Sequence, residues 1–599
     1  MPADVLQTEV LVVGSGTGGT AAALQAARAG VQTILVSEGP WLGGMLTAAG
    51  VCAPDGNELL AWQTGLWGAF LRELQTRQLE GLDHGWVSFF TYDPRIGAQI
   101  FADWVQAEAQ LTWLAGQTPQ AVLRQGSRVT GVRFDEVTVL AQVVLDGTEL
   151  GDLLELGAIP YRLGWELYDQ WQEPSAPLAP NETTQQYLVQ VPTWVVYLQD
   201  FGEQGAAPLI PPAPNAKLEQ FQAAWQDYSV AQFLSYGQIP GRRFMMNWPI
   251  KGNDYGEGVE RLFGSIAARQ AFLQEARWQS QNFAAFIQQS LGQRYGLAQT
   301  LFPEQPGALG GGAFALQPYY RESRRLRGLS TVIEQDLLPQ SQGQVATLPR
   351  NASGEISAIA IGNYVNDHHY PSGDIPLQPK ALRWGGRWTG TPFTLPYGAL
   401  VPESVDGFLV CEKNISVSHM ANGATRLQPV VLGIGQAAGM AAALCCQQGL
   451  QPRDLPVRQL QNALLSDPVA PAGLIPLFNL IPNHPDYRTW QHRMLDDPEQ
   501  YPKSGQIELC SPAMVCYPTA EGDRLQSFEG VFARTSDEAY RFTATAGETT
   551  WDLVTLDPRV QAQLQELSDG AILTLTGWPN PAGSWIRVNG LQTSIFRDT

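Results

Sequence analysis

The hydrophobic pattern near the start of the chain predicts a strand, a helix and a second strand in close succession. Residues 10–13 are apolar and β-branched, as in a parallel strand that is covered on both faces. Residues 19–29 are rich in Ala, Leu and Gln, which favours a helix packed closely against that strand. Residues 32–37 are apolar again, and Glu38 follows them. This order of elements predicts a βαβ unit.

The join between the first strand and the helix carries the motif G-x-G-x-x-G. In such a motif Gly14 permits a tight turn, Gly16 lets the backbone approach a pyrophosphate, and Gly19 allows close helix–strand contact. An acid at the end of the second strand, here Glu38, accepts hydrogen bonds from ribose hydroxyls. The motif therefore predicts an adenine dinucleotide site, although it does not distinguish FAD from NAD. A glycine-rich turn in another kind of βαβ unit is the alternative.

Later segments extend this pattern. The pair Gly43 and Gly44 comes shortly after the second strand, and residues 143–145 predict another buried strand. Residues 408–411 predict a further strand, and residues 432–444 are rich in Ala and Gly. Small residues let such a helix pack tightly, with its positive N-terminal end directed inward. The predicted fold class is α/β, with a parallel sheet of the Rossmann type.

Composition restricts the classes of partner. The formal net charge of −20 over 599 residues argues against a nucleic acid or an anionic membrane surface as partner. No basic segment followed by an apolar run opens the sequence, and no uninterrupted apolar run approaches ~18 residues. We therefore expect a cytoplasmic protein without a membrane span. Six scattered cysteines favour buried thiols, with a Cys510–Cys516 pair as the alternative. No motif for a metal site is present, and we expect none.

The combined segments resemble the FAD-dependent oxidoreductases related to the glutathione-reductase and succinate-dehydrogenase type of flavoprotein. The segment R-E-S-R-R at residues 321–325 matches that family residue for residue. The segments RFMMNWPIKGND at 243–254 and NYVNDHH at 363–369 are similar to its substrate-domain signatures. One departure occurs at residues 146–149, which read D-G-T-E where relatives commonly read D-A-T-G or D-A-T-E.

The resemblance implies FAD as the cofactor and a small organic molecule as the substrate. It implies that Glu412 bonds a ribityl hydroxyl and that the helix containing Gln436 and Ala437 faces the flavin. The full set of residues expected at the cofactor is Gly14, Ser15, Gly16, Thr17, Gly18, Gly19, Glu38, Gly39, Gly43, Gly44, Met45, Asp146, Gly147, Thr148, Glu412, Gln436 and Ala437.

The resemblance also suggests how the chain is divided. We expect a Rossmann-like FAD-binding domain, an inserted α+β substrate domain and a small C-terminal all-β domain, either a barrel or a sandwich. The expected segments are 1–160, 320–360 and 396–450 for the FAD-binding domain, 161–319 and 361–395 for the substrate domain, 451–524 for a linker that wraps the core, and 525–599 for the C-terminal domain.

Candidate catalytic residues are charged or titrate near neutrality. An arginine of the 321–325 segment can clamp a carboxylate, but a buried ion-pair network at a domain junction is the alternative. Histidines at 368 and 369 are candidate proton carriers, although such a pair in a loop is often structural. His419 is expected in the loop before the flavin-facing helix, and Arg426 about two turns before that helix. The complete candidate set is Arg321, Glu322, Arg324, Arg325, His368, His369 and His419.

Three functions remain open at this point. The favoured one is hydride transfer between flavin N5 and a small organic substrate. The second is a redox-neutral isomerase or dehydratase that uses the same cofactor, and the third is a non-catalytic scaffold that binds FAD. The sequence names neither the substrate nor the oligomeric state.

Overall fold

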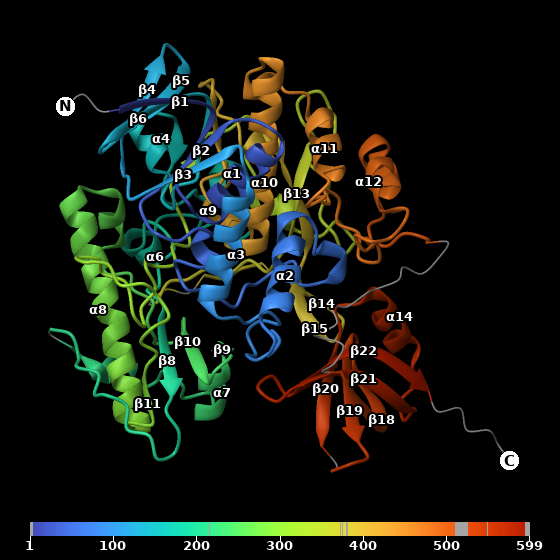
Figure 1. Cartoon of the computed structure of the whole chain (residues 1–599). Helices are drawn as coiled ribbons and strands as arrows, with labels where there is room; N and C mark the ends of the chain where they lie inside the picture. Colours follow the sequence, from blue (N-terminus) through green and yellow to red (C-terminus); the bar gives the residue numbers. More distant parts are fainter. Residues whose placement is uncertain are drawn as a thin grey trace.

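The computed structural model describes residues 4–593 except 215, 372, 374, 379–380, 510–524 and 548 (Figure 1). Its largest sheet has seven strands in the order β3-β2-β1-β6-β5-β4, with β17 paired to β6. The strands are β1 (Asp4–Val13), β2 (Thr33–Ser37), β3 (Leu111–Ala115), β4 (Pro119–Gln125), β5 (Arg128–Phe134), β6 (Val137–Asp146) and β17 (Phe408–Val410).

The register of this sheet brings several strand ends to one edge. β1, β2, β3, β6 and β17 run parallel, whereas β4, β5 and β6 form an antiparallel meander. Val13 lies opposite both Val36 and Asp146, and Val410 also lies opposite Asp146. The loops that follow β1, β2, β6 and β17 therefore meet at the same edge, which is where open α/β sheets bind their ligands. This arrangement is a Rossmann-like fold.

Two helices with small side chains cover this sheet. α1 (Thr17–Arg28) packs along α10 (Gln428–Gln448), which is longer at both ends than its Ala/Gly-rich stretch predicts. A Cβ on Gly435 would lie 2.1 Å from the Gly18 carbonyl oxygen, so the close approach requires glycine. Among the described helices, α10 alone is long and apolar enough to cross a membrane, but 83% of its most apolar window is buried in the protein. Packing against α1 accounts for that apolar character.

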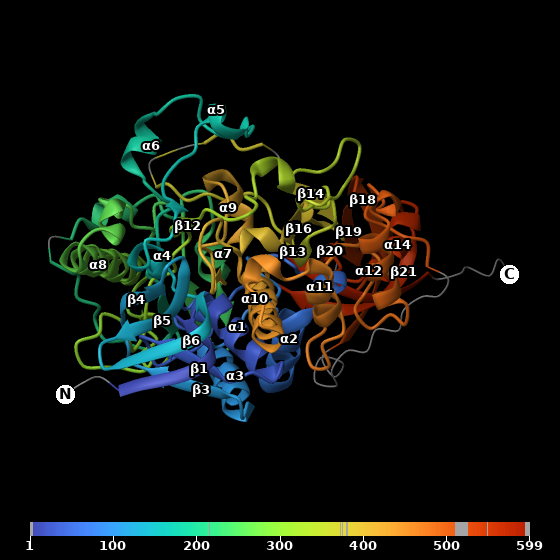
Figure 2. The ribbon, with the colours of Figure 1, turned by 90° about the horizontal axis from the view of Figure 1, so that it is seen from above.

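Residues 161–319 add a second sheet and the longest helix. The sheet has the order β11-β8-β10-β9, all antiparallel, and α8 packs against β11 and β8. In Figures 1 and 2, α8 lies on the side of the molecule opposite the C-terminal strands. The elements here are α5 (Tyr168–Trp171), α6 (Glu182–Gln186), β8 (Val196–Asp200), α7 (Val230–Ser235), β9 (Gln238–Ile239), β10 (Arg243–Met246), α8 (Ile266–Leu291) and β11 (Tyr295–Leu297).

Shorter elements connect the two sheets. β12 pairs with β7 and β13 with β16, so the described strands of 320–360 pair outside the seven-stranded sheet. The remaining elements before residue 451 are α2 (Gly65–Arg77), α3 (Pro94–Ala107), α4 (Asp152–Leu156), β7 (Tyr161–Arg162), β12 (Arg325–Leu326), β13 (Ala358–Asn363), β14 (Ala381–Trp384), β15 (Arg387–Gly390), β16 (Pro392–Pro396) and α9 (His419–Thr425).

The segment after residue 450 contains two helices, where we expected a linker that wraps the core. They are α11 (Val457–Leu465) and α12 (Tyr487–Asp496). Pro456 occupies the N-cap of α11, and Val457, Leu460 and Leu464 form its buried face at helical spacing. The prolines thus mark helix ends, and they do not exclude helices. Cys510 and Cys516 lie outside the described residues, and the four described cysteines are free.

The last segment forms a closed barrel in the order β18-β19-β20-β22-β21. Its core is separate from the main one and includes Phe532, Phe542 and Ile586. Trp585 contacts Phe89 at 5.4 Å between ring centroids, which attaches the barrel to the rest of the protein. Its elements are β18 (Gln526–Ser536), β19 (Ala539–Ala544), β20 (Thr550–Val554), α14 (Pro558–Glu566), β21 (Ile572–Asn580) and β22 (Trp585–Thr593).

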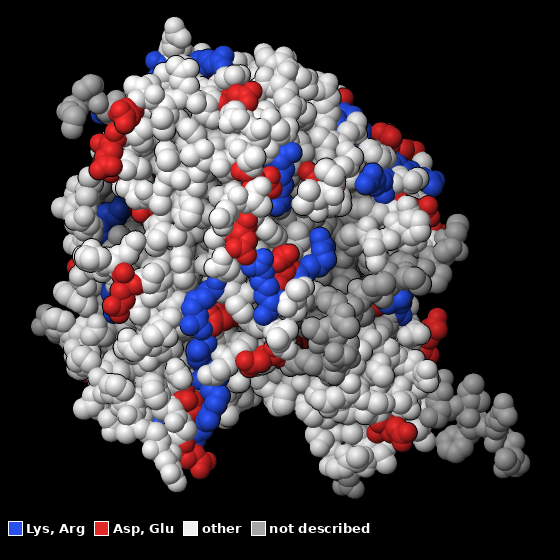
Figure 3. All heavy atoms as spheres, viewed as in Figure 1, with Lys and Arg blue, Asp and Glu red and all other residues white. Residues whose placement is uncertain are grey.

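Charged side chains are sparse on the face shown in Figure 3. Basic and acidic residues are interspersed there, and most of the surface is uncharged. Individual basic residues share acidic partners, as when Arg242 and Arg294 both pair with Asp200. Such pairs place opposite charges side by side, but they leave the net charge of −20 unchanged.

Candidate functional site

A cavity of about 350 Å³ opens at the edge where the parallel strands end. We call it the dinucleotide cavity, because its walls include the glycine-rich turn after β1 and the acid after β2. The lining residues used below are Gly14, Ser15, Gly16, Glu38, Gly39, Gly147, Thr148, Glu149, Asp152, Arg269 and Gln317.

The glycines of the motif each meet a steric requirement. Gly14 has φ +97°, and a Cβ there would lie 2.3 Å from the Gly147 carbonyl oxygen. A Cβ on Gly16 would lie 2.5 Å from Glu412 Oε2, and one on Gly19 would lie 2.1 Å from the Gly14 carbonyl oxygen. Glycine at these positions lets the turn pack against its neighbours, and Gly14 and Gly16 also present bare backbone in the cavity wall, as a bound diphosphate requires. The cradle therefore fits a dinucleotide.

Other expected cofactor residues shape the wall through their own bonds. Asp146 is buried and accepts hydrogen bonds from Thr148 N at 2.9 Å and Thr148 Oγ1 at 2.6 Å. Thr17 Oγ1 donates to the Gly43 carbonyl oxygen at 2.9 Å and accepts from Met45 N at 3.2 Å. The bonds of Asp146 fix the turn after β6, and those of Thr17 hold the segment from Gly43 to Met45 against the start of α1.

A buried ion-pair cluster lies beside the same turn. Glu412 Oε2 accepts from Gly18 N at 2.7 Å, at the N-terminus of α1, where a negative charge is favourable. Lys413 Nζ contacts Glu412 Oε1 at 2.9 Å and Glu149 Oε2 at 2.5 Å. Burial raises the pKa of Glu412 more than Lys413 lowers it. Sequence reasoning missed Lys413, because no motif marks it and its partner Glu149 is distant along the chain.

Gln436 and Ala437 line neither the dinucleotide cavity nor the polar cavity described below. Gln436 Nε2 donates to Gln25 Oε1 at 2.9 Å, and Gln436 Oε1 accepts from Leu66 N at 3.0 Å. These bonds connect α10 to α1 and α2, and Ala437 is fully buried in the core. Both residues make interhelical contacts in this structure.

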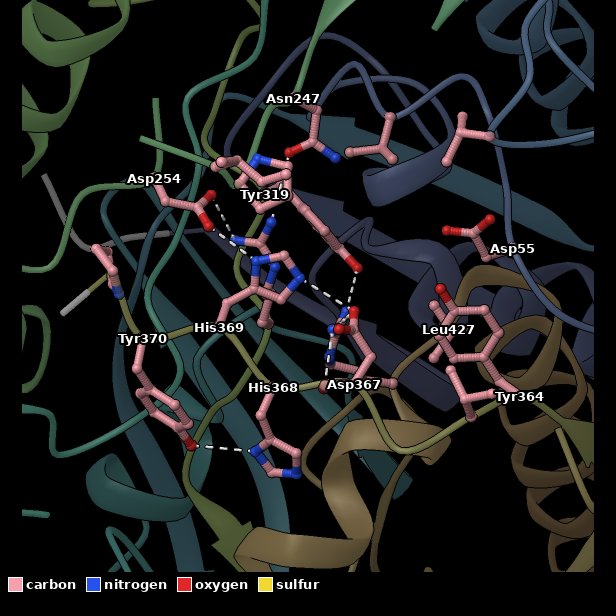
Figure 4. A pocket seen from close by; sticks show the side chains of 18 of the residues that line it. Asp55, Asn247, Asp254, Tyr319, Tyr364, Asp367, His368, His369, Tyr370 and Leu427 are labelled. Carbon is pink, nitrogen blue, oxygen red and sulfur yellow. Dashed lines mark hydrogen bonds and ion pairs between the residues drawn. The ribbon is translucent and has the colours of Figure 1, made fainter. Parts of the chain in front are cut away.

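A second cavity, of about 500 Å³, lies beyond the dinucleotide cavity (Figure 4). Two chain segments pass along both cavities: Ala48 and Gln317 line the first, and the nearby Val51 and Tyr319 line the second. We call it the polar cavity, because its lining includes Asp55, Asn247, Lys251, Asp254, Arg321, Asp367, His368, His369 and Arg426.

His369 lies between two carboxylates on one wall of the polar cavity. Its Nδ1 is 2.8 Å from Asp254 Oδ2 and its Nε2 is 3.0 Å from Asp367 Oδ2 (Figure 4). Arg321 reaches Asp254 at 3.3 Å, and Arg426 reaches Asp367 at 2.9 Å. Each carboxylate is thus shared between the imidazole and a guanidinium.

Electrostatics in this cluster favour the charged forms. Burial and Arg321 disfavour a charged imidazole, but Asp367 and Asp254 outweigh them and raise the pKa of His369 above its usual value. Burial alone would raise the pKa of Asp254 and Asp367, yet their cationic neighbours lower both. Because both ring nitrogens of His369 are bonded to carboxylates, the ring acts as a fixed positive charge. The expected role of His369 as a proton carrier remains untested.

Asp55 faces this cluster from across the cavity, beside Tyr364 and Leu427 (Figure 4). Burial, reinforced by the nearby Glu58, raises the pKa of Asp55 to about 8. Within the described part of the chain its carboxylate has no hydrogen-bond partner. Sequence reasoning missed Asp55, because it belongs to no recognised motif and its surroundings come from distant segments.

A row of hydrogen-bonded side chains leads from the polar cavity into the interior of the protein. His368 Nδ1 is 3.1 Å from the Tyr370 hydroxyl, which is 2.5 Å from His419 Nε2. His419 Nδ1 is 2.8 Å from Glu322 Oε1, and Glu322 pairs with Arg325 at 3.1 Å. Burial, and next the neighbouring His419, lower the pKa of His368 well below its usual value. This row of side chains connects the cavity wall to a fully buried carboxylate.

The structure corrects the expected positions of two of these residues. His419 is the first residue of α9, with Ser418 as N-cap, whereas we expected it in a loop. Arg426 is the C-cap of α9 and lies two residues before α10, whereas we expected it about two turns before that helix. The short helix places both side chains in the buried interior.

The 321–325 segment does not form one cluster. Arg321 points to the polar cavity, where it also donates to Thr193 Oγ1 at 2.8 Å. Arg324 contacts Asp152 at 3.1 Å, at the dinucleotide cavity. Arg325 pairs with Glu166 at 2.9 Å in the interior. The three arginines therefore contact three different sites, and Arg325 also pairs with Glu322 at 3.1 Å.

The sequence matches the family described as FAD dependent oxidoreductase over residues 9–464. The chain belongs to the FAD-dependent oxidoreductase family. No curated protein sequence matches the chain. FAD is accordingly the cofactor of this oxidoreductase, and the glycine cradle of the dinucleotide cavity is the part of the structure that fits it.

Short parts of this chain match parts of three solved structures. Thioredoxin reductase of T. acidophilum is 20% identical, over 24% of this chain and 35% of its own, with a TM-score of 0.16. GidA of Aquifex aeolicus is 16% identical, over 34% and 36%, with a TM-score of 0.21. The myxobacterial chondrochloren halogenase is 16% identical, over 34% and 46%, with a TM-score of 0.21. This chain thus covers less than half of each of these proteins.

Proposed function

We propose that this FAD-dependent oxidoreductase oxidises a small organic molecule in the polar cavity, with Asp55 accepting the proton that the substrate releases. The observation that carries the proposal is the position of Asp55, an unpartnered carboxylate opposite the His369 cluster in the same cavity. Two segments that line the dinucleotide cavity continue into this cavity, which supports its place at the redox end of the cofactor.

Bound FAD supplies hydride acceptance at flavin N5. Its adenosine side would be held by Gly14, Gly16 and Glu38. The protein's own part is to hold the substrate and to move a proton. A carboxyl with a pKa of about 8 is well matched to accept a proton near neutral pH.

The opposite wall stabilises negative charge on the substrate oxygen. His369, Arg321 and Arg426 are cationic, and their carboxylate partners fix them in place. As an O–H proton moves to Asp55, these fixed charges favour the oxyanion that precedes hydride loss. The proposed reaction thus converts a carbon bearing a hydroxyl into a carbonyl.

The test is anaerobic bleaching of the flavin absorbance, followed in a stopped-flow instrument with an alcohol identified by screening. We expect the reduction rate to rise with pH, tenfold per unit, up to about pH 8, because Asp55 must be ionised. Asp55→Asn should remove this rise and slow reduction by roughly 10²–10⁴-fold, with FAD retained.

Asp169→Asn, at an exposed position of α5, is the matched control and should behave like the wild type. An unchanged pH profile in Asp55→Asn would refute the role of Asp55. Turnover of a substrate without any flavin bleaching would favour redox-neutral chemistry.

A further inference from the structure

A third cavity, of about 900 Å³, lies next to the polar cavity. The two cavities share Pro249, Lys251, Asp254 and Pro371 in their walls. We call it the outer cavity. Tyr187 in the outer cavity packs against Tyr370 in the polar cavity, with ring centroids 5.6 Å apart. The volumes of the polar cavity and the outer cavity together exceed ~1,000 Å³, which is the upper range for a site that binds a single small ligand. The combined space therefore suits an extended ligand.

One face of α8 forms a wall of the outer cavity. Glu275, Trp278, Gln279 and Asn282 lie at helical spacing, and all four line it. A helix of a globular protein normally directs apolar residues into the molecule at such positions. Here the face that borders the outer cavity carries polar and aromatic side chains, of which Asn282 is buried and the other three are half-buried. This pattern indicates a surface that contacts a polar ligand.

The lining combines aromatic rings with side-chain amides. Tyr187, Tyr255 and Trp278 supply rings, and Gln220, Gln279 and Asn282 supply amides. Gln279 already bonds Gln220 and the Gly252 carbonyl oxygen, and Asn282 Oδ1 accepts from Ala213 N, so Gln220 Oε1 and Asn282 Nδ2 are the amide atoms that make no hydrogen bond within the described residues. The Trp278 side chain is half-buried, and within the described part of the chain its indole N–H makes no hydrogen bond. Aromatic faces cover apolar C–H surfaces, while amides both donate and accept hydrogen bonds. Few ligands present C–H faces and hydroxyls together as sugars do.

Charge in the outer cavity is close to balanced. Lys217 and Lys251 face Asp254, Glu257 and Glu275, and Glu275 is already paired with Arg261 at 3.0 Å between Arg261 Nη1 and Glu275 Oε1. Asp254 is likewise neutralised, because it is paired with Arg321 and His369. No strong net charge remains to select an anionic or cationic ligand, so the cavity suits a neutral one.

We propose that the outer cavity binds the sugar units of a neutral carbohydrate whose terminal unit enters the polar cavity for oxidation. The inference rests on the function proposed above. At the terminal unit, a carbon bearing a hydroxyl becomes a carbonyl: its C–H electron pair leaves as hydride to FAD, and the O–H proton goes to Asp55. The further units contact Trp278 and the amides, and they undergo no chemistry.

The experiment compares monosaccharides with their linear tetrasaccharides as substrates for anaerobic flavin reduction. The probes are glucose, mannose and xylose and their β-1,4-linked and available α-1,4-linked tetramers. We expect one tetramer to exceed its monomer in kcat/KM by at least 30-fold. Trp278→Ala should reduce that advantage to below threefold and leave kcat/KM for the monomer unchanged, whereas Trp278→Phe should retain most of it.

Binding measured by titration calorimetry separates this inference from the proposed function. Asp55→Asn should bind the tetramer as the wild type does, although it reduces flavin slowly. If Asp55→Asn reduces flavin at the wild-type rate while Trp278→Ala loses tetramer binding, the role of Asp55 fails and the outer site remains. If no tetramer binds better than its monomer, or if Trp278→Ala affects monomer and tetramer equally, the carbohydrate site is refuted.

Discussion

Replacing Arg325 by methionine should destabilise the protein strongly. The Arg325 side chain is fully buried and pairs with two carboxylates, Glu166 at 2.9 Å and Glu322 at 3.1 Å. Methionine fills similar volume but leaves both carboxylates without their cation. Removing one partner of a buried ion pair costs about 3–5 kcal/mol. We expect the free energy of unfolding at pH 7.5 to fall by about this amount.

The pH dependence of this loss tests its cause. Burial would raise the pKa of Glu166, but Arg325 outweighs burial and lowers it. The stabilisation by this pair is therefore present above the unfolded carboxyl pKa of about 4.3 and is lost as the pH falls through the lower folded pKa. In Arg325→Met the unpaired carboxyls bind protons more readily in the folded state. The difference between variant and wild type should therefore be smaller at pH 5 than at pH 7.5.

The assay is urea unfolding of the FAD-loaded protein, followed by flavin fluorescence so that the separate barrel core does not contribute. The control is Arg350→Met, because Arg350 and its partner Glu499 are 46% and 86% exposed and such pairs contribute only about 0–1 kcal/mol. A loss below about 1 kcal/mol in Arg325→Met, equal at both pH values, would refute the reasoning.

Three further predictions concern the cofactor and the polar cavity. Gly16→Val should give colourless protein, because its side chain would collide with Glu412, and full FAD occupancy measured by absorbance would contradict this. His369→Asn should slow flavin reduction at least tenfold, about 1.4 kcal/mol, with FAD retained. Unfolding or flavin release would instead indicate a structural role. Arg324→Ala should weaken FAD binding about tenfold in fluorescence titration, through loss of its contact with Asp152, while kcat at saturating FAD stays unchanged.

The glycine-rich turn was predictable, because the motif is complete within six residues and the strand–turn–helix order around it is visible in the sequence. Its distant neighbours were not predictable from the motif, since a Cβ on Gly14 would meet Gly147 and a Cβ on Gly16 would meet Glu412. The helix α11 was also predictable in principle, because Val457 and Leu460 are apolar residues at helical spacing. The prediction of a linker over residues 451–524 was therefore wrong for these helices.

The polar cavity was only partly predictable. The sequence pointed to His369 and Arg321, but their shared partner Asp254 lies 115 positions from His369 and 67 from Arg321, so the pairing depends on tertiary structure. In an extended segment successive side chains point in different directions, so neighbours such as Arg324 and Arg325 reach different sites. Burial raises the pKa of Asp55, and this burial results from elements that are distant along the chain. No local sequence pattern predicts it.

The bond between Gly18 N and Glu412 Oε2 joins residues 394 positions apart and has a consequence for biosynthesis. α1 also packs along α10, which ends at Gln448. The part of the protein around the dinucleotide cavity is therefore incomplete until the ribosome has made residue 448. At ordinary elongation rates of ~5–20 residues per second, synthesis from the end of α1 to the end of α10 takes roughly 20–80 s. During that interval the Ala-rich surface of α1 is uncovered. We expect the nascent chain to depend on a chaperone until this late helix emerges.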